Sequence, residues 1–564
     1  MARNIMIQGT MSNAGKSLLT AGILRVLKQD GYRAAPFKSQ NMALNSYITE
    51  EGLEMGRAQV MQAEAAGIAP QVCMNPILLK PTSDVGSQVI VNGEVRGNYS
   101  AADYFGMKRT LIPDIMAAYH KLEEQADVIV IEGAGSPAEI NLKQDDIVNM
   151  GLAKLVDAPV LLVGDIDRGG VFAQLLGTVV LLEEEERARI KGFVINKFRG
   201  DARLLEPGPS MLYEKCGIET LGVMPYLQIQ IDDEDSLSEQ LEYRGVREET
   251  ERGMHDLRDI LNLAVIRLPH ISNFTDFNPL NRFPFVSVQY VDKPEQLAGI
   301  AAGMGTAGAG RTGVDLIILP GSKNTIQDMR WLRESGMEAA VLKQAAGGSR
   351  IMGICGGYQM LGSKICDPGG VEAAGITEIR GMGLLPVTTV LREKKRRSRI
   401  AGSVCCADPG GRTDAPWRLL QGVPVSGYEI HMGETQYGND EKEKKENIRP
   451  FSILADGRED GCVRGSVLGT YLHGIFEEEV FTQKMIEVLC EDRGISYERL
   501  TAGDKGEPEC EKAEPVSADF EAARCKTAHF RSYREFKESQ YDLLADAVRR
   551  AFDMDKLYEI IFGA

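Results

Sequence analysis

Residues 4–17 read NIMIQGTMSNAGKS, and LLTAGILRVLKQDG follows directly. An apolar run, a glycine-containing loop and a second apolar run with helical spacing predict a strand, a loop and a helix. The loop, Gly9–Ser17, is one residue longer than the common phosphate-binding loop. At a helix start, backbone N–H groups bind oxyanions, a lysine ammonium reaches phosphate oxygens and a hydroxyl can hold Mg²⁺. We therefore predict a nucleotide site, and the alternative is an ordinary glycine-rich turn.

The residues expected to bind the nucleotide lie on this loop and on one later strand. They are Thr10, Asn13, Gly15, Lys16, Ser17 and Asn196. Phosphoryl transfer also needs a carboxylate for the metal ion, and Glu132 ends the apolar run VIVIE. We expect Mg²⁺ at Ser17 and Glu132, with Asp165 and Asp167 as weaker candidates. The alternative for Glu132 is a solvated acid at a strand end.

Apolar runs alternate with longer amphipathic segments through the first third of the chain. Continuous apolar runs are typical of parallel strands that helices cover on both faces. The strand candidates are Asn4–Gln8, Ala34–Phe37, Val128–Glu132, Pro159–Gly164 and Ile190–Asn196. They predict an α/β fold with a doubly wound sheet, and ligands collect at the carboxyl ends of such strands.

A second α/β pattern follows an acidic, polar stretch. Its strand candidates are Leu263–Leu268, Phe285–Tyr290, Leu316–Leu319, Ile351–Ile354 and Val467–Tyr471. We predict a first domain at 1–232, a linker at 233–260, a second domain at 261–490, and an insertion (502–526) with helices within 491–564. Gly303–Gly308 matches a dinucleotide motif but precedes a strand, so we interpret it as a loop.

A glycine-flanked cysteine lies in RIMGICGGYQMLG, residues 350–362. Glycines two residues before and after Cys355 permit the sharp strand-to-helix turn that exposes a nucleophile. A thiol needs a nearby base to become a thiolate. We prefer His473, which ends a strand in the same half of the chain, and His431 in GYEIHMGE is the rival. The alternatives are a buried core thiol and structural histidines.

Two other segments of the second half were also considered. The turn at Gly321 in LPGSKNT follows a strand and could supply N–H groups to an oxyanion. The basic run REKKRRSR at 392–399 is interpreted as a hairpin loop, with contact to an anionic substrate as the alternative.

Composition excludes several classes of protein. The chain has 64 Lys and Arg against 81 Asp and Glu, a net charge of −17, which argues against a nucleic-acid surface. Its apolar runs are too short to span a bilayer, and it has no CxxC pair. We expect a soluble, cytoplasmic protein that binds neither nucleic acid nor membrane, and a homo-oligomer stays open.

Together the motifs resemble the cobyric acid synthase family of glutamine-hydrolysing amidoligases. The motifs that carry the resemblance occur in family order: GTMSNAGKS, PFKSQNMALNS, EGAGSPAEINL, GDIDRGGVFA, PGSKNT, GICGGYQMLG and GTYLHGIF. The first half is similar to dethiobiotin-synthetase-type P-loop ATPases, and the second is similar to class I glutamine amidotransferase domains.

This resemblance implies ATP and Mg²⁺ as cofactors, and a corrinoid and glutamine as further substrates. ATP would activate carboxylates of adenosylcobyrinic a,c-diamide as acyl phosphates, and ammonia from glutamine would convert the b, d, e and g carboxylates to amides. By the same resemblance, Cys355 is the glutaminase nucleophile and His473 its base. Lys38 matches a lysine near the substrate carboxylate, and Gln359 matches a position that binds glutamine.

One departure concerns the residue behind the base. The class I pattern has a glutamate two residues after the histidine, and this chain has Ile475 there. We therefore predict that Cys355 and His473 act as a dyad, oriented by a backbone carbonyl or a distant acid. Glu477, the nearest acid in sequence, is expected to face solvent.

Two other functions were weighed against this one. One is a related two-domain amidoligase, such as cobyrinic a,c-diamide synthase, which only the exact residues of the motifs distinguish from it. A P-loop regulatory ATPase would explain only the first half, and that class has a second lysine in the loop where this chain has Met11.

Overall fold

The computed structural model describes residues 2–83, 86–227, 229–232, 259–303, 314–372, 375–406, 416–437, 448–501 and 532–563. Most of the predicted linker 233–260, most of the Gly303–Gly308 motif and the predicted insertion 502–526 lie outside them. The chain divides into two compact units: unit 1, Met1–Asp235 with Lys537–Ala564, and unit 2, Ser236–Phe536. Within the described ranges, no helix has both the length and the apolar character needed to cross a membrane.

Unit 1 is built on a six-stranded sheet with the strand order β12–β11–β10–β1–β9–β2, parallel throughout. The strands are β1 Arg3–Gly9, β2 Ala34–Phe37, β9 Val128–Glu132, β10 Val160–Asp165, β11 Ile190–Phe198 and β12 Thr220–Pro225. Ile5 and Ile7 belong to one apolar cluster and Met6 to another, because successive side chains of a strand point to opposite faces. The sheet is therefore covered on both faces, which confirms the doubly wound fold.

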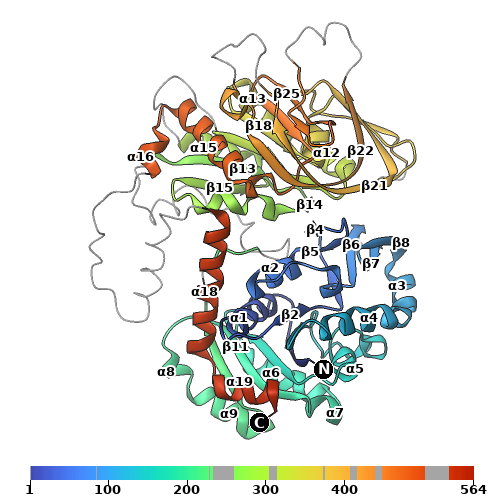
Figure 1. Cartoon of the computed structure of the whole chain (residues 1–564), viewed down its shortest axis with the longest axis vertical. Coiled ribbons are helices and arrows are strands. Elements are labelled where there is room, and N and C mark those ends of the chain that lie inside the picture. Colours follow the sequence, from blue (N-terminus) through green and yellow to red (C-terminus); the bar gives the residue numbers. More distant parts are fainter. Residues whose placement is uncertain are drawn as a thin grey trace. The chain divides into compact units, whose positions relative to one another are not determined.

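Helices and two small sheets surround this sheet (Figure 1). The helices before the linker are α1 Lys16–Gln29, α2 Arg57–Ala66, α3 Ala101–Met107, α4 Ile112–Glu123, α5 Met150–Leu155, α6 Val171–Leu181, α7 Glu184–Arg187, α8 Ala202–Leu205 and α9 Pro207–Cys216. One small sheet contains β3 Gln40–Met42, β6 Ile77–Ser83, β7 Gly86–Val91 and β8 Glu94–Ser100. The other contains β4 Ser46–Ile48 and β5 Glu54–Gly56.

Two C-terminal helices complete unit 1. They are α18, Tyr533–Ala551, and α19, Met554–Phe562. The part of α18 from Lys537 onward belongs to unit 1. Drawn in red in Figure 1, α18 lies beside α1, where Arg25 Nε is 2.8 Å from Asp542 Oδ1. A methyl group on Gly22 of α1 would lie 2.7 Å from Val548 Cγ2, so the two helices approach closely. The helix that follows the phosphate loop is thus supported by a segment from the other end of the sequence.

Unit 2 has its own six-stranded sheet, in the order β15–β13–β16–β18–β26–β25. Its strands are β13 Leu261–Ile266, β15 Val286–Val291, β16 Leu316–Leu319, β18 Arg350–Ile354, β25 Cys462–Arg464 and β26 Val467–Thr470. All pairs are parallel except β25 with β26. The helices of this unit are α11 Pro294–Gly303, α12 Thr325–Glu334, α13 Met337–Ala346, α14 Gly356–Leu361, α15 Glu479–Arg493 and α16 Tyr497–Thr501. Each strand predicted for this half from its apolar run is present, β16 with the predicted ends and the others with ends shifted by one or two residues.

A second sheet of unit 2 corrects one prediction. Its strands are β19 Lys364–Cys366, β20 Glu378–Arg380, β21 Val387–Val404, β22 Pro424–Tyr437, β23 Ser452–Leu454 and β24 Glu459–Asp460. The basic run 392–399 is not a hairpin loop, because it lies inside β21. β21 is held by an antiparallel ladder with β22, which is interrupted between Leu391 and Arg396, and many of its side chains are exposed. A separate two-stranded ladder joins β14 Ile271–Ser272 to β17 Gly321–Ser322.

Candidate active sites

The loop between β1 and α1 has the shape of an anion cradle. Gly15 precedes the helix in the left-handed conformation, with φ 88°, and a methyl group on it would lie 2.0 Å from Asn196 Nδ2. Only glycine fits such a position. Asn196 Nδ2 donates to the Ala14 carbonyl oxygen at 2.8 Å, and Lys16 Nζ donates to the Met11 carbonyl oxygen at 3.1 Å. The structure thus brings the predicted residues Gly15, Lys16 and Asn196 together.

The other two predicted loop residues play different local parts. Asn13 adopts a positive φ of 59°, a conformation that asparagine tolerates better than most residues. Thr10 Oγ1 donates to Gln174 Oε1 on α6 at 3.1 Å, so its hydroxyl contacts the neighbouring helix. Both stay predictions as nucleotide contacts.

Glu132, at the end of β9, is the centre of a buried polar cluster. Its Oε1 accepts a hydrogen bond from Ser17 Oγ at 2.9 Å and lies 2.9 Å from Lys38 Nζ. Its Oε2 accepts from Gln62 Nε2 at 2.6 Å. The side chains of Glu132 and Lys38 are 1% and 6% exposed, so each charge is compensated by the other inside the protein. Ser17, Lys38 and Glu132 come from three separate motifs, whereas Gln62 on α2 had no signal in the sequence.

This cluster fits the predicted Mg²⁺. A hydroxyl and a carboxylate side by side offer the oxygen ligands that Mg²⁺ accepts next to nucleotide phosphates. In the described part of the chain, no group of three or more His, Cys, Asp and Glu could hold a metal by itself. Ser17 and Glu132 would therefore share the ion with phosphate and water oxygens.

The weaker metal candidates form separate ion pairs. Asp165 Oδ2 lies 2.9 Å from Lys197 Nζ, and Asp167 Oδ1 lies 2.9 Å from Arg199 Nε. Each carboxylate already has a cationic partner on β11 or just after it. Glu132 is also paired with a cation, Lys38, but it alone of the three bonds to the Ser17 hydroxyl, so it remains the preferred metal carboxylate.

In unit 2, Cys355 occupies a strained turn between β18 and α14. Its φ is 51° and its ψ is −107°, outside the backbone conformations that residues other than glycine prefer. Methyl groups on Gly353 and Gly357 would lie 2.7 Å from the Tyr358 nitrogen and 1.9 Å from the Leu319 carbonyl oxygen. The flanking glycines are therefore required for the tight strand-to-helix turn that a nucleophile elbow uses.

His473 follows β26, the strand next to β18, and it is held by a carboxylate. Its Nδ1 lies 2.7 Å from Asp276 Oδ2, and Gly474 N donates to Asp276 Oδ1 at 3.1 Å. Burial alone would lower the pKa of His473, but the charges of Asp276 and Cys355 and the hydrogen bonds with both raise the pKa well above its usual value. A protonated imidazole of this kind is the partner that stabilises a thiolate.

Asp276 decides between the two orienting groups that the sequence left open behind His473. Of the two orienting groups considered, a backbone carbonyl and a distant acid, the structure contains the acid, 197 residues away in sequence. Ile475 is fully buried in the apolar core of unit 2, and Glu477 is exposed, as expected. Asp276 lies in the 3-10 helix Phe274–Arg282 and had no signal in the sequence, because the acid was sought next to the histidine.

Gly321 lies directly against the base. A methyl group on it would be 2.9 Å from both His473 Cε1 and Ser272 Oγ. Its backbone pairs with Ser272 in the β14–β17 ladder. The turn after β16 therefore reaches the Cys355–His473 pair, and its part in binding an oxyanion stays a prediction.

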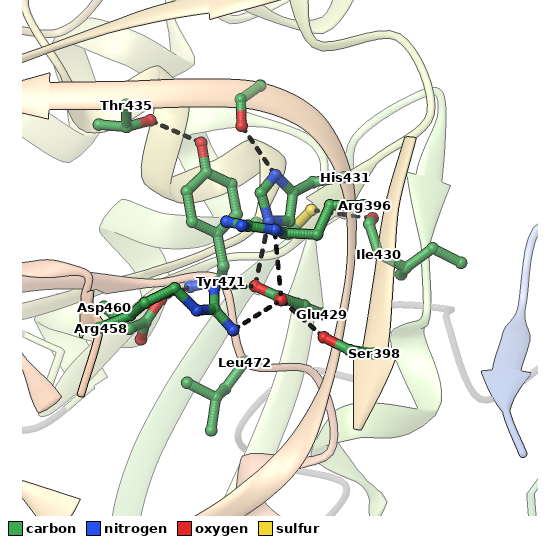
Figure 2. A network of polar contacts seen from close by, with 12 residues as sticks. Arg396, Ser398, Glu429, Ile430, His431, Thr435, Arg458, Asp460, Tyr471 and Leu472 are labelled. Atoms are coloured by element: carbon green, nitrogen blue, oxygen red, sulfur yellow. Dashed lines mark hydrogen bonds and ion pairs between the residues drawn. The ribbon is translucent and has the colours of Figure 1, made fainter. Parts of the chain in front are cut away.

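The rival histidine, His431, belongs to a second polar network with Tyr471 and Thr435 (Figure 2), and Gln359 bonds to the same Tyr471. Gln359 Nε2 donates to Tyr471 Oη at 3.2 Å, and Tyr471 Oη lies 2.5 Å from Thr435 Oγ1. The His431 ring stacks on the Tyr471 ring with centroids 3.8 Å apart, and its Nδ1 donates to the Gly433 carbonyl oxygen at 2.8 Å. His431 is thus fixed by its own strand, and His473 is the histidine paired with Cys355.

Comparison with known proteins finds matches for both halves of the chain. Residues 5–236 match the CobQ/CobB/MinD/ParA nucleotide binding domain, and residues 262–481 match the CobB/CobQ-like glutamine amidotransferase domain. A cobyric acid synthase of Lachnoclostridium phytofermentans is 51% identical over 100% of this chain and 99% of its own length. The chain belongs to the cobyric acid synthase family. Other relatives of that name, from Ruminiclostridium cellulolyticum and Thermoanaerobacter sp., are 48% and 45% identical over 100% of this chain and 97% and 99% of theirs. The family resemblance and the fold class predicted from the motifs are therefore confirmed.

Proposed function

We propose that the chain amidates the b, d, e and g carboxylates of adenosylcobyrinic a,c-diamide to give cobyric acid, using ATP, Mg²⁺ and ammonia from glutamine. Family membership makes it a glutamine-hydrolysing ligase of cobalamin biosynthesis. The observation that supports the finer proposal is one chain with both a Ser17–Lys38–Glu132 cluster and a Cys355–His473 pair. We also place the reaction in the cytoplasm, where ATP and glutamine are available.

In the glutaminase site, His473 takes the proton of the Cys355 thiol. The thiolate sulfur attacks the side-chain carbonyl carbon of glutamine, and the oxyanion formed there needs backbone N–H donors. His473 returns the proton to the leaving nitrogen, so ammonia departs and a thioester remains. Water, deprotonated by the same imidazole, cleaves the thioester to glutamate and restores the thiol. Asp276 fixes the ring and stabilises the imidazolium at each proton transfer.

In unit 1, a carboxylate oxygen of the corrinoid attacks the γ-phosphorus of ATP, and ADP leaves. Ammonia then attacks the acyl carbon, phosphate departs, and the added nitrogen loses a proton to give the neutral amide. Lys16 is placed to bind phosphate oxygens, and Lys38 is a buried cation beside Glu132 that can offset the charge of the substrate carboxylate. Mg²⁺ at Ser17 and Glu132 would neutralise charge on the transferred phosphoryl group.

The first test incubates the purified protein with ATP, glutamine and candidate corrinoids, and measures the molecular masses of the products. Conversion of the a,c-diamide at further carboxylates supports the proposal. Conversion of cobyrinic acid at the a and c positions, with none beyond the diamide, would instead favour a cobyrinic a,c-diamide synthase.

A second test separates the two sites. Cys355→Ala should lose glutamine-driven amidation and keep amidation driven by added ammonium, because only the first needs the thiolate. Lys16→Ala should lose both, because acyl phosphate formation precedes amidation from either nitrogen source. Glutamine-driven turnover by Cys355→Ala would show that the nucleophile is misassigned.

A further inference from the structure

Two buried polar residues on β22 flank the backbone beside the nucleophile, and the mechanism above uses neither. The Ile430 carbonyl oxygen lies 3.8 Å from Cys355 Sγ. Glu429 and His431 are its neighbours in the chain, with side chains 4% and 7% exposed. Figure 2 shows this Glu429–His431 pair at the centre of a network of polar contacts. Burying such groups is costly unless each is bonded, so the arrangement needs a reason.

Glu429 is an ionised anchor. Its carboxylate accepts hydrogen bonds from Ser398 Oγ at 2.7 Å and Arg458 Nη2 at 3.1 Å, and it lies 3.6 Å from Arg396 Nε. His431 Nε2 is 3.5 Å from Glu429 Oε2. Burial would raise the pKa of Glu429, but the nearby His431 ring and the hydrogen bonds from Ser398 and Arg458 outweigh it and hold the pKa at about 2. The carboxylate is therefore charged at every pH at which the enzyme would be assayed.

His431 connects this anchor to the backbone further along β22. Its Nδ1 donates to the Gly433 carbonyl oxygen at 2.8 Å, two residues on. Its ring lies on the ring of Tyr471, with an interplanar angle of 16°. The imidazole thus contacts Glu429, the Gly433 carbonyl and the Tyr471 ring. Because it bonds to the backbone of its own strand, it also fixes the conformation of residues 430–433.

Residues 430–433 also lie next to the side chain of Gln359. A methyl group on Gly433 would lie 2.3 Å from Gln359 Nε2 and 3.1 Å from Tyr471 Oη. Gln359 Nε2 also donates to Tyr471 Oη. The segment fixed by His431 thus contacts the nucleophile at Ile430 and the predicted glutamine-binding side chain at Gly433.

We propose that the Glu429–His431 pair is a positioning element of the glutamine pocket, and that it sets the affinity for L-glutamine by fixing residues 430–433. The inference rests on the proposed glutaminase function of Cys355. Neither residue touches the reacting atoms, so the pair governs the KM for glutamine rather than the turnover of bound glutamine.

The experiment compares four variants of the full chain. Glu429→Gln removes the anchoring charge, and His431→Leu removes the hydrogen bond to Gly433. His431→Asn keeps a side-chain N–H that can donate to the same carbonyl. The matched control is Glu434→Gln, because Glu434 lies on the same strand and pairs with Arg392 on β21 at 3.0 Å, but it is 63% exposed.

Glutamine hydrolysis should show a KM raised tenfold or more in Glu429→Gln and His431→Leu, with kcat within about threefold of the parent. His431→Asn should recover part of the loss, and Glu434→Gln should match the parent. Amidation from added ammonium should be unchanged in all four. Because a large change at a buried charge can unfold the chain, Ser398→Ala serves as a milder variant that removes one hydrogen bond to Glu429 and should raise the KM by a smaller factor.

A second readout follows alkylation of Cys355 by iodoacetamide, with L-glutamine added as protectant. Glutamine should protect the parent, and the anchor variants should need a tenfold higher concentration for the same protection. If glutamine fails to protect the parent, the glutaminase assignment itself falls. If it protects the parent and the folded variants at equal concentration, or if kcat falls at constant KM, only the positioning role is refuted.

Discussion

Replacing Asp276 by asparagine should inactivate the glutaminase although the two side chains have nearly the same shape. One carboxylate oxygen accepts from Gly474 N at 3.1 Å and the other faces His473 Nδ1 at 2.7 Å. An asparagine has one acceptor oxygen. If that oxygen keeps the bond to Gly474, the amide N–H faces Nδ1, and the neutral imidazole must then carry its proton on Nε2. That tautomer has no lone pair on Nε2 with which to take a proton from Cys355.

The size of the loss follows from the charge that disappears. The equivalent change in a serine triad costs about four orders of magnitude. A thiol, with a pKa near 8.5, needs less help than a hydroxyl. We therefore expect kcat for glutamine hydrolysis to fall about 100- to 1000-fold in Asp276→Asn, and on the order of a thousandfold or more in His473→Ala.

The assay measures glutamate release, and the ammonium-driven reaction reports whether unit 1 remains intact. The matched control is Glu477→Gln, four residues after His473 and exposed, which should change glutamine hydrolysis by less than about tenfold. Asp276→Asn also removes the charge that raises the pKa of His473, so alkylation of Cys355 at neutral pH should slow. A fully active, folded Asp276→Asn would refute the role of the carboxylate, and a Glu477→Gln loss as large as that of His473→Ala would locate the acid at Glu477.

Three other changes test separate parts of the molecule. Lys38→Ala should raise the corrinoid KM or lower kcat for amidation, because Glu132 would then repel the substrate carboxylate. Glutamate release should stay normal. Unchanged kinetics of amidation would show that Lys38 is not part of the site. Gly321→Ala should lower glutaminase activity, since the new methyl group would lie 2.9 Å from His473 Cε1, and it should spare ammonium-driven amidation. Full glutaminase activity in this variant would contradict the placement of Gly321 against His473. Burial raises the pKa of Asp315 from 3.8 to about 6, despite Arg493 beside it. The folded state therefore loses about 3 kcal/mol as the pH rises from about 4 to 6 and stays so above, and Asp315→Asn should flatten the pH dependence of the unfolding free energy measured in urea.

The strands of the two central parallel sheets were mostly predictable, because each of those predicted is buried on both faces and so consists of a continuous apolar run. β2, β9 and β16 begin and end at the predicted residues. The phosphate loop and the turn at Cys355 were predictable because their glycines form short sequence patterns, although methyl groups on Gly15 and Gly357 would collide with the distant residues Asn196 and Leu319.

Contacts between distant segments left no such pattern. Asp276 reaches His473 across 197 residues, and Gln62 reaches Glu132 from a helix whose glutamines look ordinary in sequence. The basic run in β21 was misassigned because its strand is specified by pairing with β22 and not by alternation of apolar side chains. Local propensity says little where a partner strand supplies the stability.

The return of α18 and α19 to unit 1 has a consequence for synthesis of the chain. Leu544 and Val548 pack against Gly22 of α1, yet the ribosome makes the whole of Ser236–Phe536 between these two parts. At bacterial translation speeds of about 5–20 residues per second, the nascent unit 1 waits roughly 15–60 s with that face of α1 uncovered. During this interval the apolar surface is open to chaperones and to aggregation. A nonsense mutation late in the gene would therefore damage the nucleotide-binding half, although the stop lies far beyond it in the sequence.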